Sequence, residues 1–170
     1  MTDLTAINKS LIEIGQLLAS NAKLRALLLD DDDQPSMTKE FVQNANFNSL
    51  TRDKVLSIGV PGSYGIERDH MTRNTSIVII LDRVSFHDEM THATTFIYTS
   101  CDVDHILLKN NRNRLFEINQ EIVKTLQGAK ITSSGAIQVD ELDSIRYNEF
   151  VVGYRISLDY INQDSERTML

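Results

Sequence analysis

The most regular hydrophobic pattern of the chain lies in residues 150–161. Apolar side chains occupy every second position there, namely Phe150, Val152, Tyr154, Ile156, Leu158 and Tyr160. A period of two places these side chains on one face of a β-strand. Arg155, Ser157 and Asp159 lie between them and make the middle of the opposite face polar. The pattern therefore predicts a strand in a sheet that has one buried face and one face partly exposed to water.

Further strands are predicted upstream. Residues 75–81 carry apolar side chains at both odd and even positions, which is typical of a central strand covered on both faces. Residues 94–101 are rich in β-branched and aromatic types and are predicted to form its hairpin partner, across a polar turn at residues 85–91. Shorter strands are predicted over residues 54–60 and 136–142. Most connections are short, so the sheet should be mainly antiparallel.

Helical periodicity occurs at the N-terminus and in the second half of the chain. The first helix is indicated by apolar residues spaced by three and four, namely Leu4, Ile7, Leu11, Ile14 and Leu18. Asn21 is the expected cap of a second helix through Leu28, and Ser36 that of a helical stretch over residues 37–44. The clearest amphipathic pattern runs from Asn110 to Gln127, and Gly128 follows it as the expected exit.

Together these elements predict an α+β fold, in which a mainly antiparallel sheet is packed by one long helix of the C-terminal half, with the N-terminal helices as an extra layer. We divide the chain into an N-terminal helical arm (residues 1–35), an α+β core domain (residues 36–162) and a flexible tail (residues 163–170). A chain of 170 residues is long enough for one such domain with a proper core.

Composition narrows the range of functions. The chain is 41% hydrophobic and 24% charged, as expected of a folded protein, and its net charge of −7 disfavours a generic nucleic-acid-binding role. Cys101 is the only cysteine, which excludes an intrachain disulfide and indicates a reducing compartment. The first residues lack a signal-peptide pattern, and no segment approaches the roughly 20 apolar residues of a membrane span. We therefore expect a soluble protein assembled from the cytosol, without a membrane partner.

The most reactive residue types gather in Cys101, Asp102, Asp104 and His105. Such side chains can bind a metal ion, but a zinc site normally shows Cys or His at paired spacings, and the second pair is missing here. We therefore predict a buried cysteine at the end of a strand, followed by the start of a polar loop.

A second group, His87, Asp88, Glu89 and His92, falls in the predicted hairpin turn. An exposed turn shifts pKa values little, so this group does not predict acid–base catalysis.

Two loops are the remaining candidate functional segments. Residues 59–65 contain three glycines without a phosphate-binding motif, and the charged stretch continues to Arg73. This segment is predicted to be a surface loop, either mobile or ordered against a partner. Residues 30–33 are four aspartates without the ligand spacing of a calcium loop, and predict a solvated acidic turn. We assign no catalytic, cofactor-binding or metal-binding residue and no cofactor.

The order of the elements and the residue patterns within them resemble those of phage head–tail neck proteins, in particular small α+β tail terminators. The residues that carry this resemblance are Ile14 to Leu28 with the Ser20-Asn21 break, the hairpin of residues 76–82 and 95–99, the helix around residues 114–122, and the strand of residues 153–158. The resemblance implies a structural virion protein without enzymatic activity. It would form a ring, commonly a hexamer, at the neck of the virion, terminate the tail tube and join it to the connector.

The partners that this resemblance implies are copies of the chain itself, the tail tube protein and the head–tail connector or adaptor proteins. DNA would pass through the bore without specific binding. Three alternatives stay open: another phage connector, adaptor or baseplate component, a small metal-dependent hydrolase that uses Asp102, Asp104 and His105, and a monomeric binding or immunity-type domain.

Overall fold

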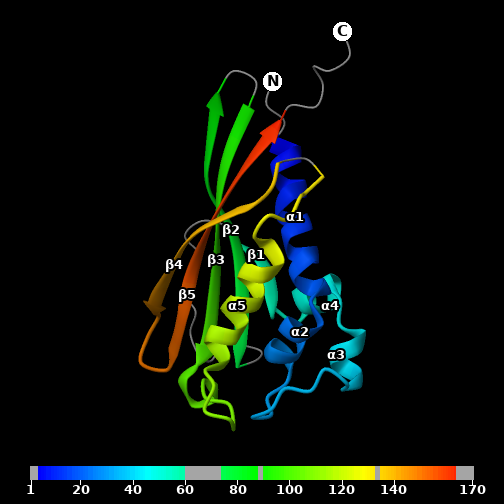
Figure 1. Cartoon of the computed structure of the whole chain (residues 1–170), viewed down its shortest axis with the longest axis vertical. Coiled ribbons are helices and arrows are strands. Elements are labelled where there is room, and N and C mark those ends of the chain that lie inside the picture. The colour runs from blue at the N-terminus through cyan, green and yellow to red at the C-terminus, as the bar shows by residue number, and fades with distance from the viewer. Residues whose placement is uncertain (1–3, 60–73, 88–89, 133–134, 164–170) are drawn as a thin grey trace.

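The structure is a computed structural model that describes residues 4–59, 74–87, 90–132 and 135–163 (Figure 1). It has an α+β fold, as predicted. The elements in chain order are α1 (Leu4–Ser20), α2 (Ala22–Leu29), α3 (Glu40–Asn44), α4 (Phe47–Arg52), β1 (Leu56–Gly59), β2 (Thr75–His87), β3 (Met90–Asp102), the 3-10 turn η2 (Val103–His105), α5 (Arg114–Leu126), β4 (Gln138–Arg146) and β5 (Val151–Gln163).

The five strands form one mixed sheet in the order β1-β2-β3-β5-β4. β1 runs parallel to β2, whereas the other three neighbouring pairs are antiparallel. The long strands β2, β3 and β5 form the centre, and β1 and β4 are the two free edges. The sheet is thus mainly antiparallel, and the predicted pairing of residues 75–81 with residues 94–101 is confirmed as β2 with β3.

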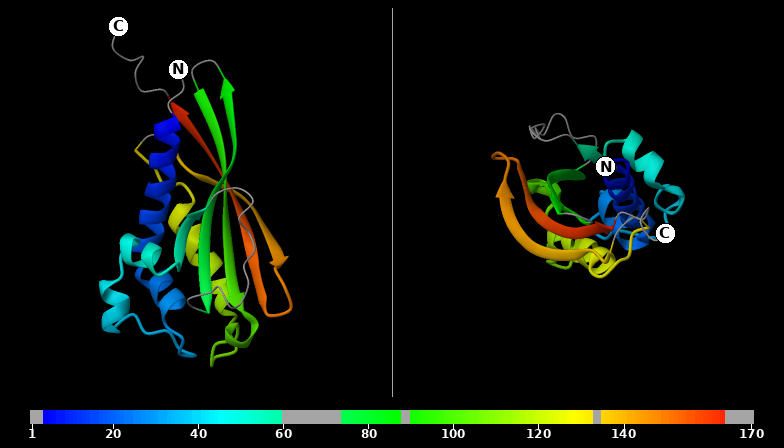
Figure 2. Two further views of the ribbon diagram at one scale, coloured as in Figure 1. Left: turned by 180° about the vertical axis from the view of Figure 1, so that it is seen from behind. Right: turned by 90° about the horizontal axis from the view of Figure 1, so that it is seen from above.

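The helices α1, α2 and α5 lie on one face of this sheet (Figures 1 and 2). α4 packs beside β1 and α1, and α3 packs on α2. The expected long helix of the C-terminal half is not confirmed, because α1 with 17 residues is the longest helix and α5 has 13. Asn113 caps α5 by accepting a hydrogen bond from the Phe116 N–H at 3.1 Å, so the helix begins at Arg114 instead of Asn110. None of the helices in the described ranges has both the length and the hydrophobicity of a membrane span.

A hydrophobic cluster lies between the helices and the sheet. Ile14 of α1 and Leu24 of α2 are fully buried in it, together with Ile97 of β3, Ile122 of α5 and Ile156 of β5. The described helices of the predicted N-terminal arm, residues 1–35, thus contribute to the same core as the sheet. Their removal would uncover the apolar face of the central strands.

The β2–β3 hairpin is longer than predicted. We expected a polar turn over residues 85–91, but Ser85 pairs with His92 and Phe86 with Thr91 within the ladder. β5 pairs with β3 along this whole stretch, from Met90 opposite Gln163 onward. The polar residues are held in strands because backbone hydrogen bonds, from β3 to both β2 and β5 and from this end of β2 to β3, outweigh their weak intrinsic preference for a strand.

α4 was not predicted, since residues 44–53 looked polar and turn-like. Asn46 starts this helix with a capping box, in which its side chain accepts from the Ser49 N–H at 3.0 Å and the Ser49 hydroxyl accepts from the Asn46 N–H at 2.9 Å. Its single buried side chain is Leu50. One apolar anchor is too weak a periodic signal to reveal a helix of six residues.

Candidate functional site

The acidic segment after α2 is not a solvated turn throughout, contrary to the prediction for residues 30–33. Asp30 is 1% exposed, whereas Asp31, Asp32 and Asp33 are exposed. The Asp30 carboxylate accepts hydrogen bonds from the main-chain N–H groups of Asp32 (3.1 Å) and Ser36 (2.7 Å) and from Lys39 Nζ (2.8 Å). A carboxylate can be buried here because each of these donors lies close in the chain and replaces water.

Burial alone would raise the pKa of Asp30, but the hydrogen bonds from Lys39 and from the two main-chain N–H groups outweigh it and lower the pKa below its usual value. The group therefore stays ionised at neutral pH. An ionised carboxylate at this position accepts all three hydrogen bonds, and so fixes the path of the chain between α2 and α3.

The guanidinium of Arg114, which is 3% exposed, holds the same segment from the other side. It donates to the main-chain oxygens of Leu27 (3.0 Å), Asp30 (2.6 Å) and Asp32 (2.9 Å), and its Nε donates to the oxygen of His105 (3.1 Å). These carbonyls include free acceptors at the C-terminal end of α2, where a cation is also favoured by the helix dipole. Arg114 thus ties the start of α5 to the end of α2.

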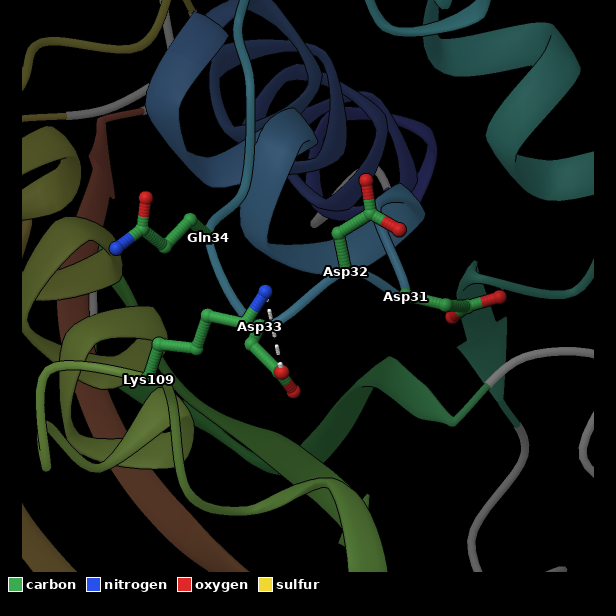
Figure 3. Close-up of a pocket in the computed structure, with 5 residues that line it drawn as sticks. All are labelled: Asp31, Asp32, Asp33, Gln34 and Lys109. Atoms are coloured by element: carbon green, nitrogen blue, oxygen red, sulfur yellow. Dashed lines mark ion pairs between the residues drawn. The ribbon is translucent and has the colours of Figure 1, made fainter.

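The exposed aspartates surround a shallow hollow that Gln34 and Lys109 also line (Figure 3). Lys109 Nζ lies 3.7 Å from a carboxylate oxygen of Asp33, and Asp31 accepts a hydrogen bond from Asn74. The carboxylates of Asp31, Asp32 and Asp33 point in different directions in Figure 3. They do not converge on one point, as ligands of a metal ion would have to.

Cys101, Asp102, Asp104 and His105 also fail to form a common site. The Cys101 thiol is fully buried, and burial raises its pKa to about 12. The Asp102 carboxylate instead caps the turn η2 by accepting from the Asp104 N–H at 3.0 Å, and His105 Nδ1 lies 4.0 Å from it. Within the described ranges, no group of three such side chains is placed to bind a metal ion.

The other predicted candidates fall partly outside the described residues. His92 is half-buried on β3, whereas Asp88 and Glu89 lie outside, as does the loop of residues 60–73 that we expected to contact a partner. Gly59 ends β1. Of the four residues predicted to lie in an exposed turn, the described ones therefore belong to the ladder: His87 ends β2 opposite Met90, and His92 lies within β3.

A surface that the sequence did not indicate lies between α5 and the edge strand β4. It is a groove of about 630 Å³. The residues that line it are Arg112, Asn113, Phe116, Glu117, Asn119, Gln120, Val123, Lys124 and Leu142. Phe116 is 55% exposed and Leu142 is 44% exposed, and the Phe116 ring packs on Tyr154 at a centroid distance of 5.6 Å. Apolar residues at these positions look like core residues in a sequence, so the pattern could not show that they face a groove.

Comparisons with known proteins leave the family open. No protein-family model matches the chain, and no curated protein matches it. The function has to be inferred from the surfaces of the molecule. Among these, the α5–β4 groove exposes two large apolar side chains, Phe116 and Leu142, next to the edge strand β4.

The charged residues of α5 and of β4 are arranged differently. On α5, Glu117 pairs with Arg112 at 2.5 Å, and Glu121 pairs with Lys23 at 3.0 Å and with Lys124 at 3.1 Å. Burial would raise the pKa of Glu121, but hydrogen bonds from the two lysines lower it instead. The glutamates of α5 are thus neutralised within the chain.

On β4 the acidic side chains are exposed. Asp140, Glu141 and Asp143 all lie on this edge strand, where Arg146 is the only basic residue. Asp143 pairs with Arg155 at 2.6 Å. Leu142 is the β4 residue that lines the groove, and the neighbouring Glu141 and Asp143 point to the opposite face of the sheet.

Proposed function

We propose that this protein is a structural component of a tailed-phage virion, which forms a ring at the head–tail neck, terminates the tail tube there and joins it to the connector. The ring is formed by copies of the chain, which we expect to be six, as the resemblance to tail terminators implies. The role of the protein is structural, because each subunit acts by fitting against its neighbours and against the adjacent virion proteins.

The α5–β4 groove is the observation that carries this proposal. Phe116 and Leu142 together leave an apolar surface open beside an unpaired strand, and such a surface on a folded domain is typical of a protein–protein contact. Most of the exposed surface of the groove is apolar, although six of its nine lining residues are polar or charged. An open apolar surface of this kind favours an assembly protein.

The order of elements supports the same proposal. The two N-terminal helices separate at Asn21, whose side chain caps α2 by accepting from the Leu24 N–H at 2.9 Å. The central hairpin β2–β3, the helix α5 and the strand β5 contain the other segments on which the resemblance to tail terminators is based. The acidic net charge adds to this, because an acidic bore would repel the phosphates of passing DNA.

The proposal is tested on intact virus particles. We expect mass spectrometry to find the chain in purified particles, in a small fixed copy number that fits one ring, and cryo-electron microscopy of particles with a tagged subunit to place the tag at the neck. Particles made without the protein should accumulate as separate heads and tails. Complete particles that lack the protein would overturn the proposal, and a tag at the baseplate would favour a different tail component.

A further inference from the structure

β4 is bonded to a neighbouring strand on one side only. It is the last strand of the sheet order and, among the described strands, pairs with β5 alone (Figure 1). Where the chain turns into β5, the Tyr147 N–H donates to the Val151 oxygen at 3.0 Å, so these two residues form a hydrogen-bonded pair. Such pairs alternate along an antiparallel ladder, and the N–H and C=O groups of Leu142, Ser144 and Arg146 therefore point away from β5.

The start of this outer edge is occupied within the chain. The Val139 N–H donates to the side-chain oxygen of Gln127 at 2.9 Å, and the ladder register then shifts at Asp140. Beyond this bulge, no group of the described residues bonds to the outward main-chain groups of Leu142 and Ser144. The free part of the edge thus begins at the residue that also lines the α5–β4 groove.

The side chains of β4 alternate between two environments. Leu142 pairs with the buried Ile156, so it lies on the α5 side of the sheet, where it lines the groove with Phe116. Glu141 points to the opposite face. Glu141 and the bulged Asp140 are exposed, and neither forms an ion pair with a described residue. The edge is therefore apolar toward α5 and carries an unpaired negative charge on the other face.

We propose that an extended segment of a neighbouring virion protein adds to the sheet beyond β4, with apolar and basic side chains at alternate positions. Its main chain bonds to the outward groups of Leu142 and Ser144, as in other cases of strand addition. Its apolar side chains lie beside Leu142 on the side of the groove, and its basic side chains lie beside Glu141. This inference rests on the proposed function for the source of the segment, and it adds the chemistry of the contact.

A strand is the occupant that fits the edge and the groove together. Paired residues of neighbouring strands point to the same face of a sheet, so the residue opposite Leu142 points to the α5 side, where Phe116 is 55% exposed. The residue opposite Glu141 points to the other face, where a basic side chain meets the opposite charge. A helix laid in the groove would leave the outward main-chain groups of β4 without a partner.

The β4 strand of a second copy fits this edge less well. β4 carries the acidic residues Asp140, Glu141 and Asp143 against the basic Arg146. Two such edges placed side by side bring like charges together, which destabilises cross-strand pairs and protects edges from pairing with their own kind. The same charges favour a basic strand.

The test uses a synthetic peptide of nine residues, the length of β4, in which valine and lysine alternate. Fluorescence anisotropy with the full-length chain at low salt should give a dissociation constant below about 1 mM. Ser144→Pro removes an outward N–H without removing a bond to β5, so the variant should fold and bind the peptide at least about tenfold more weakly. Glu141→Lys should weaken binding by a similar factor, because it repels the lysines.

The matched controls are Ser144→Ala, which keeps the N–H, and Glu40→Lys, which makes the same change of charge at an exposed position of α3. Both should bind within about twofold of the wild type. The same peptide with a fully N-methylated main chain keeps its charge but cannot donate, and should bind at least about tenfold more weakly. No binding of the unmethylated peptide, or equal binding to Ser144→Pro and the wild type, overturns strand addition. Unchanged binding to Glu141→Lys overturns the preference for a basic strand.

Assembled particles separate a failure of this contact from a failure of the proposed function. With Ser144→Pro we expect separate heads and tails to accumulate, although the purified variant unfolds at the same temperature as Ser144→Ala. Complete particles that carry Ser144→Pro at the neck overturn the contact and leave the proposed function standing. Self-association of the wild type that Ser144→Pro abolishes assigns the edge to a second copy and overturns the proposed partner.

Discussion

Arg114 donates a 2.6 Å hydrogen bond to the main-chain oxygen of Asp30, a residue 84 positions earlier in the chain. The same guanidinium binds three further carbonyls, and the Asp30 carboxylate binds two main-chain N–H groups and Lys39. The two residues therefore fix both sides of the acidic segment. The exposed aspartates that follow are displayed on a backbone that is held in place by buried hydrogen bonds.

Substitution of Arg114 by methionine should lower the free energy of unfolding by about 3 kcal/mol, because four carbonyls lose their donor in a site with little access to water. Urea denaturation followed by circular dichroism measures the change. Arg52→Met, at a highly exposed arginine, should change the same quantity by less than about 0.5 kcal/mol. Equal stability of the two variants would show that the Arg114 hydrogen bonds do not stabilise the fold.

The lowered pKa of Asp30 predicts a specific loss of stability in acid. The unfolded chain takes up the proton at a higher pH than the folded chain, so the contribution of Asp30 is complete above its ordinary pKa of 3.8 and disappears as the pH falls through the lower value of the folded state. Asp30→Asn should cost about 1–3 kcal/mol at neutral pH, and should remove this part of the pH dependence from urea titrations between neutral and acid pH.

The matched control for Asp30 is Asp33→Asn in the same segment. The Asp33 side chain is 56% exposed, and at neutral pH we expect its substitution to change the free energy of unfolding by less than about 0.5 kcal/mol. A pH dependence in Asp30→Asn that equals that of the wild type would assign the acid sensitivity to other carboxylates.

Gly153 of β5 should not tolerate a side chain. A Cβ at this position would lie 1.8 Å from the main-chain oxygen of Thr99 and 2.7 Å from the ring of Tyr147, whose hydroxyl donates to the same oxygen at 3.2 Å. Gly153→Ala should destabilise the protein by about 3 kcal/mol or more, since β3 and β5 would have to separate. Gly135→Ala is the control, because its Cβ would meet only ordinary contacts at 3.7 Å. The thermal unfolding midpoints of both variants, compared with that of the wild type, test this prediction.

The Cys101 thiol should not react in the folded protein. It is fully buried, and burial raises its pKa to about 12, so the thiolate that attacks disulfide reagents is scarce and inaccessible. At about pH 8 we expect Ellman's reagent to label the native protein only as fast as it unfolds, and to label one thiol per chain at once in denaturant. Rapid labelling of the native protein would place the thiol at the surface.

Local patterns in the sequence predicted most elements, for a physical reason. A period of two in residues 150–161 and spacings of three and four near the N-terminus arise from the geometry of a single strand or helix, so neighbours in the chain reveal them. Ile156, Leu158 and Tyr160 are buried on one face of β5, as this pattern predicts. The pattern does not hold in the first half of the strand: Phe150 precedes it and is 43% exposed, and Val152 and Tyr154 are only half-buried. Val151 and Ser157 of the opposite face are buried as well.

The sequence by itself determined the α+β class, the positions of α1, α2 and the central hairpin, and a burial pattern for β5, because these follow from residues close together in the chain. Tertiary structure alone decided that Asp30 is buried, that β1 runs parallel to β2, and that Phe116 and Leu142 face a groove. The pairing of β1 and the groove depend on segments that lie apart in the sequence. The donors to the Asp30 carboxylate are local, and the distant partner of this residue is Arg114, which binds its main-chain oxygen. The guanidinium that holds the acidic segment comes from α5, and the groove exists only because α5 and β4 leave space between them.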